Sequence, residues 1–152
     1  MILVAQQPNY FPWLGYLEQL ERADCFVVLD DVQWIRSGWQ RRARILSQTE
    51  RVRFQWLSLP LHQARQHDFI KDLILDPASN WPLKHWNKLV SVYGHRPYFE
   101  SQIASHFKLW FESLDRRRLQ GEVLHFCDVM GENLLLCSQA VGMSASASDS
   151  HR

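Results

Sequence analysis

The sequence predicts an α/β fold: an N-terminal βαβ unit of a parallel-type sheet, a β-hairpin and a helical C-terminal half. Three observations support it. Two apolar runs flank a helical pattern in residues 2–29, and apolar and polar side chains alternate within residues 42–59. Beyond residue 80, apolar side chains recur with the period of a helix. The chain has 152 residues, 46% hydrophobic and 22% charged, enough for one core. We expect a single domain over 1–142 and a mobile polar tail over 143–152.

The βαβ unit is predicted from its two apolar runs. Residues 2–5 are continuously apolar, which is typical of a strand that a parallel sheet buries on both faces. A leucine at every third position from Leu14 to Leu20 indicates a helix with one apolar stripe. A second apolar run from Cys25 to Leu29 predicts the neighbouring strand. Such a unit places the carboxyl ends of both strands at one edge.

The middle of the chain predicts a β-hairpin. Residues 42–47 and 52–59 form its strands about the sequence SQTE, because apolar and polar side chains alternate in the second segment. Pro60 ends this strand, and residues 70–75 are predicted to form another short strand.

The C-terminal half predicts three helices. The first begins after Asn80 as a capping residue and ends at Gly94 in the left-handed conformation. The second begins near Pro97 and carries a strong apolar stripe. The third covers residues 121–141 and ends at Gly142.

The first candidate site is the turn in "QQPNYFPWLGYLEQL", which begins at residue 6. Ligands of open α/β folds bind at the carboxyl ends of strands, and glutamine amides can both donate to and accept from sugar hydroxyls or a base. Equally, the aromatic side chains here could simply cover the core, so both interpretations stay open. The candidate substrate-binding residues are Gln6, Gln7, Tyr10 and Trp13.

The second candidate site is the segment "LDDVQWIRSGWQRRARIL", which begins at residue 29. Asp30 and Asp31 directly follow a strand and are candidate catalytic carboxylates. Arginine forks bind phosphates and carboxylates, and indoles can stack a base or a sugar. A sugar or nucleotide-sugar diphosphate fits this chemistry, although aspartate–arginine pairs or a solvated hairpin face would give the same pattern. The candidate binding residues here are Arg36, Trp39 and Arg42.

His85 is a third candidate, as a general base or a ligand for an anion. A single histidine on a helix is, however, commonly a surface or capping residue. The seven histidines show no metal-binding spacing, so we expect no metal site. No nucleotide-binding glycine motif occurs, and no feature identifies a cofactor or a protein partner.

Charge, cysteine content and hydropathy exclude other classes. The net charge of +1 argues against a dedicated nucleic-acid binder. Three cysteines without close pairing fit a reducing cytoplasm, which is the expected location. No apolar run approaches the about 20 residues of a membrane span.

The stretch "QQPNYFPWLGYLEQLERADCFVVLDDVQWIRSGWQRRARI" resembles the WbqC-like protein family. The resemblance continues through "WLSLPL" and "NWPLKHWNKLVSVYGHRPYFE", so that it covers most of residues 2–142. It adds Gln33 to the candidate substrate-binding residues.

The resemblance implies a bacterial transferase of surface-polysaccharide (O-antigen, lipopolysaccharide) or sugar-nucleotide metabolism. The reaction it implies is transfer of an aminoacyl group such as glycine to an amino sugar. Two departures keep a non-catalytic binding or assembly protein open as the alternative. Arg41 and Ala43 replace asparagines that are usual in the family, and the chain is expected to be a C-terminally shortened member.

Overall fold

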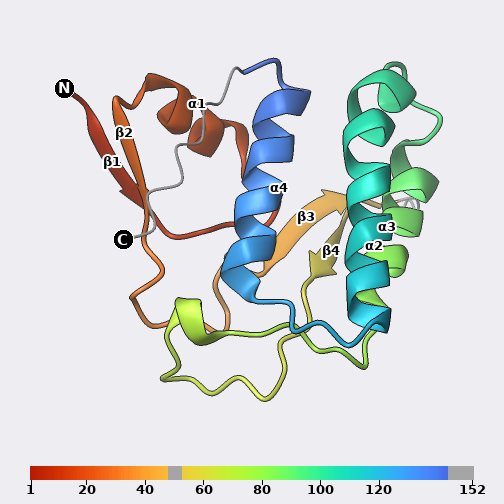
Figure 1. The fold of residues 1–152 in the computed structure, drawn as a ribbon. Coiled ribbons are helices and arrows are strands. Elements are labelled where there is room, and N and C mark those ends of the chain that lie inside the picture. The colour runs from red at the N-terminus through yellow and green to blue at the C-terminus, as the bar shows by residue number, and fades with distance from the viewer. Residues whose placement is uncertain (48–52, 144–152) are drawn as a thin grey trace.

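The computed structural model describes residues 1–47 and 53–143 (Figure 1). Its first region consists of β1 (Leu3–Gln6), α1 (Leu14–Arg22) and β2 (Cys25–Val28). The two strands pair in parallel, with Leu3 opposite Cys25 and Gln6 opposite Val28. The predicted βαβ unit is therefore confirmed.

The expected burial of this unit on both faces is wrong. Leu3 is 62% exposed, and Val27 and Val28 are also exposed. Within the described residues the sheet has two strands, and β1 and β2 lie at one side of the molecule, away from α2 and α3 (Figure 1). One face is partly covered by α1, whose Tyr16 ring packs against Phe26 at 5.3 Å, whereas the face that carries Leu3 and Val27 is open among the described residues.

The predicted hairpin is present as β3 (Arg42–Leu46) and β4 (Phe54–Ser58), which pair antiparallel. Ala43, Ile45 and Leu57 point into the core, whereas Arg44 and Trp56 lie opposite each other on the exposed face. Most of the predicted turn, including residues 48–50, lies outside the described residues, as does residue 52.

The helical half contains α2 (Trp81–Tyr93), the π-helical turn η2 (Phe99–Ala104), α3 (Ser105–Leu119) and α4 (Phe126–Ala140). The third helix begins at residue 126 rather than 121, because the preceding segment forms a β-bridge between His125 and Ile74.

The first C-terminal helix, α2, begins after Asn80 and ends before Gly94 as predicted, but the conformations expected at these two residues are wrong. The Asn80 side chain makes no capping hydrogen bond at the start of α2. Gly94 is right-handed with φ −57°, since the chain continues turning beyond α2. Gly142 does adopt a left-handed φ of +80° after α4.

Residues 70–75 do not form the predicted strand. They begin with a 3₁₀ turn, η1 (Ile70–Asp72), and only Ile74 and Leu75 make isolated β-bridges. Ile70 and Leu73 are both buried, and the Leu73 N–H donates to the Ile70 carbonyl, so the chain curls to place both side chains in the core.

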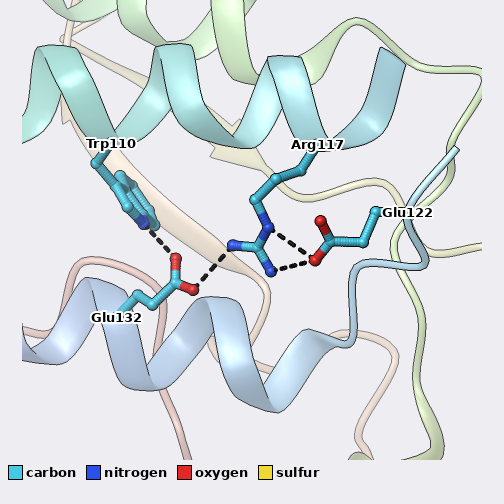
Figure 2. Close-up of polar contacts among 4 residues, drawn as sticks. All are labelled: Trp110, Arg117, Glu122 and Glu132. Carbon is cyan, nitrogen blue, oxygen red and sulfur yellow. Dashed lines mark hydrogen bonds and ion pairs between the residues drawn. The ribbon is translucent and has the colours of Figure 1, made fainter. Parts of the chain in front are cut away.

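Polar side chains join α3 to α4 beside this core (Figure 2). The Trp110 indole N–H donates to one oxygen of Glu132 at 2.7 Å, and Arg117 donates to the other at 2.9 Å. Arg117 also pairs with Glu122, in the loop between the helices, at 2.8 Å. These contacts hold both helices and their connecting loop in one arrangement.

Candidate functional site

A cavity of about 850 Å³, hereafter the large cavity, lies where β1 ends. Its walls come from residues 5–7 at the end of β1, from the turn over residues 9–13 and from Leu29. Further lining residues lie between positions 35 and 44, in the segment before β3 and at the start of β3. It lies at the carboxyl edge of the parallel pair, where α/β folds bind their ligands. Six predicted site residues line it, namely Gln6, Gln7, Tyr10, Trp13, Trp39 and Arg42.

The proline–aromatic turn is anchored in the helical core through Phe11. This residue has a left-handed φ of +46°, which is uncommon for a bulky side chain. Its N–H donates to the Asn133 side-chain oxygen at 2.8 Å, and its ring packs against Phe107 and Phe111. The turn therefore takes its position from α3 and α4, so the cavity wall is built onto the best-packed part of the molecule.

The two interpretations of this turn apply to different residues. Tyr10 is buried and covers the core while also lining the large cavity, whereas Trp13 is 65% exposed. The Trp13 ring folds over Gly15: a side-chain carbon added there would lie 1.8 Å from the ring. Glycine is thus required at position 15 for Trp13 to keep this place.

Glutamine side chains hold the polar wall of the large cavity. The Gln40 amide donates to the Gln7 side-chain oxygen at 2.6 Å, and its own oxygen accepts the Ile35 N–H at 3.0 Å. The Tyr10 N–H donates to the Gln40 carbonyl at 2.9 Å. Gln6 is held separately by the Gln19 side chain at 2.9 Å. The amides are therefore oriented before any ligand arrives, which lowers the entropy cost of binding.

Arginines and aromatic rings interleave along the hairpin side of the cavity. The rings of Trp39 and Trp56 lie 5.1 Å apart, and the Arg42 guanidinium lies 4.5 Å over Trp56. Arg44 lies 4.5 Å over Phe54 and 5.6 Å from Trp39. Such cation–π contacts hold the long side chains in place while their charge remains available to an anion.

The local charge is positive. Burial, followed by the charges of Arg42 and Arg36, lowers the pKa of Arg41. No Asp or Glu occurs among the residues that line the large cavity. The site therefore favours an anionic ligand.

The predicted acids lie close to the cavity in sequence but do not line it. Leu29 donates to the Gln6 carbonyl at 2.8 Å, so Asp30 and Asp31 follow β2 at the same sheet edge. The Asp30 charge instead helps burial to raise the pKa of the Cys127 thiol to about 12. Gln33 and Arg36 are exposed and are not among the lining residues either.

His85 lies in the wall of a second cavity of about 310 Å³, hereafter the small cavity. Burial and then the charge of Lys88 lower the pKa of His85 to about 4, so the ring is neutral at pH 7. The Ser58 backbone opposes this shift. The Nδ1 atom of His85 is hydrogen-bonded to the Tyr10 hydroxyl at 2.9 Å.

Sequence reasoning did not identify Gln40, Arg44 or Asn133 as site residues. Gln40 and Asn133 are buried and position the cavity wall, and Arg44 lines it. The sequence signal for Arg44 was its place among the clustered arginines, but nothing marked either amide as buried.

Among residues 1–47 and 53–143, no three His, Cys, Asp or Glu side chains gather in a way that suits a metal ion. The helices described there are all too short or too polar to cross a bilayer.

The model of the WbqC-like protein family matches residues 7–148. The chain belongs to the WbqC-like protein family. It is 31% identical over 94 residues to the uncharacterized protein Rv1507c of Mycobacterium tuberculosis (strain ATCC 25618 / H37Rv). That match covers 61% of this chain and 39% of the relative, so the chain spans well under two thirds of the relative's length. No solved structure matches the chain.

Proposed function

We propose that this WbqC-like protein binds a phosphorylated sugar of the nucleotide-sugar class in the large cavity. The observation that carries the proposal is the lining of this cavity: indole rings, side-chain amides and two arginines, without a carboxylate. Arginine forks match diphosphate oxygens, and aromatic rings pack against sugar faces or bases.

The cavity offers a separate partner for each part of such a ligand. Arg42 and Arg44 supply positive charge for the diphosphate beside the exposed ring of Trp39. Gln7 lines the cavity, and its amide nitrogen, which has no hydrogen-bond partner among the described residues, can donate to a sugar hydroxyl.

Family membership supports the metabolic setting. The role in bacterial surface-polysaccharide or O-antigen metabolism, with transfer of an aminoacyl group to an amino sugar, follows from the family resemblance. A non-catalytic binding protein of the same pathway is the second candidate. It is favoured by the absence of any carboxylate or imidazole from the residues that line the large cavity.

Calorimetric titration with UDP-glucose tests the binding proposal. We expect Arg42→Gln/Arg44→Gln to weaken affinity by roughly tenfold or more, because each lost charge-assisted hydrogen bond contributes about 1.5–3 kcal/mol. Arg116→Gln, on the exposed surface of α3, is the matched control and should bind like the wild type. Equal affinity in all three proteins would overturn the proposal.

The two candidate functions differ in turnover. Asp31→Asn should leave UDP-glucose affinity unchanged under both, because Asp31 does not line the cavity. Mass spectrometry of an amino-sugar nucleotide, after incubation with each protein and an activated aminoacyl donor whose leaving group is released on transfer, then separates them. Product formed by the wild type supports a transferase, and no product from it supports the non-catalytic candidate. Loss of product in Asp31→Asn then assigns Asp31 a role in the transfer, whereas equal product formation removes Asp31 from the mechanism.

A further inference from the structure

The small cavity lies beside the large one and is connected to it by two side-chain pairs. Trp39 lines the large cavity and Trp56 lines the small one, with their rings 5.1 Å apart. Tyr10 lines the large cavity, and its hydroxyl bonds to His85 in the wall of the small one. A molecule in either cavity is therefore one side-chain layer away from the other.

Two lysines give the small cavity its charge. Lys84 and Lys88 stand four residues apart on α2, so they share one helix face. Lys88 donates one hydrogen bond to the Trp56 carbonyl at 2.8 Å, which leaves further ammonium hydrogens for another acceptor. Lys84 has no ion-pair or hydrogen-bond partner for its ammonium group among the described residues. No Asp or Glu lines this cavity.

A buried donor in the cavity wall also lacks an acceptor. Trp81 is 2% exposed and lines the small cavity, and its indole N–H has no hydrogen-bond partner among the described residues. Buried N–H groups are almost always paired in native proteins, because an unpaired one costs about 1–3 kcal/mol. Trp81 therefore adds, independently of the lysines, an unpartnered donor to the residues that line this cavity.

The three remaining polar residues of the lining, Ser58, Ser79 and His85, are compatible with such a ligand. His85 is neutral, since burial lowers its pKa to about 4, and its Nδ1 is engaged by the Tyr10 hydroxyl, so it adds no charge to the cavity. Ser79 lines the cavity and can donate through its hydroxyl. The wall as a whole presents donors and positive charge to a volume of about 310 Å³.

We propose that the small cavity is an oxyanion site that binds a phosphoryl group. It is distinct from the sugar-binding site proposed for the large cavity, and it does not depend on that proposal. If both sites are occupied together, the phosphoryl group belongs to a second substrate, placed next to the first.

The test is a titration with inorganic phosphate, followed by ³¹P NMR, on wild type and two variants. Lys84→Gln removes one charge from an exposed position, and Trp81→Phe removes the indole N–H while keeping a ring. We expect phosphate affinity to fall by roughly tenfold in Lys84→Gln, the loss of one charge-assisted contact. Lys108→Gln, on the exposed face of α3, is the matched control and should not change it.

Three outcomes would overturn the proposal. Phosphate affinity equal in wild type and Lys84→Gln would remove the site. Equal competition by acetate would show a carboxylate site instead of a phosphoryl site. An equal loss of UDP-glucose affinity in Lys84→Gln would show that both cavities belong to one binding site. Lost phosphate binding with unchanged UDP-glucose affinity supports a separate site.

Discussion

The β1–β2 pair and the helical half are both rich in apolar residues, but they bury them very differently. Leu3, Val27 and Val28 are exposed in the strand pair, whereas Phe111 and Leu114 of α3 have no exposed surface. The difference shows that an apolar run identifies side chains that can be buried, whereas the neighbouring elements determine which of these side chains are buried. The large cavity lies at the end of the strand pair, and its turn is fixed from the helical side through Phe11.

The largest expected effect is in the helical core. Phe111→Ala should lower the free energy of unfolding by ~3–5 kcal/mol, because a fully buried ring leaves a cavity. Leu109→Ala, on the exposed face of the same helix, should change it by less than about 0.5 kcal/mol. Urea denaturation measures both, and similar losses would contradict the contrast between these faces.

Acid should destabilise the helical side through His85. Burial lowers its pKa from 6.5 to about 4, so between these values the unfolded chain binds a proton more readily than the folded one. Stability is therefore complete above pH 6.5 and falls towards pH 4, by roughly 3 kcal/mol at most. Denaturation of wild type and His85→Gln at several pH values checks this, and the same slope in both proteins would contradict it.

Asn133→Ala should loosen the connection between the two regions. The partly buried Phe11 N–H would lose its acceptor, which costs about 1–3 kcal/mol of stability. Since Phe11 anchors the turn, UDP-glucose affinity should fall as well, while Gln139→Ala on the exposed side of α4 changes neither. Loss of stability with intact affinity would show that the cavity wall does not depend on this anchor.

A smaller effect is expected at the helix-joining contacts. Glu132→Gln removes the ionic part of its pairing with Arg117 and should cost about 1 kcal/mol or less, because both side chains are partly exposed. The difference from wild type should shrink at high salt. Thermal unfolding at two salt concentrations measures it, and a salt-independent loss would point to packing instead.

The smallest effect is expected in the strand pair. Leu3→Ser should change the free energy of unfolding by less than about 0.5 kcal/mol, since Leu3 is mostly exposed. A loss of several times this size, measured by urea denaturation, would show that the strand is covered in solution and would remove the contrast with α3.

Several elements followed from local patterns. The parallel strands, the hairpin and the three helices were predictable, because the spacing of apolar residues and the positions of turn residues indicate local helix and strand conformation. The segment over residues 70–75 was not, since two buried side chains bend it into a turn that its composition does not reveal. Likewise, the clustered arginines indicated an anion site, but not that Arg44 lines it while Arg36 remains outside.

By itself, the sequence determined the family, the order of strands and helices, and the gathering of amides, indoles and arginines at the first sheet edge. Only the tertiary structure decided which of them share a cavity. Asp30 and Asp31 follow the right strand yet lie outside the large cavity, while Gln40, from a later segment, orients Gln7 inside it. The physical reason is that side-chain direction and burial depend on contacts between segments far apart in the chain, such as Phe11 with Asn133.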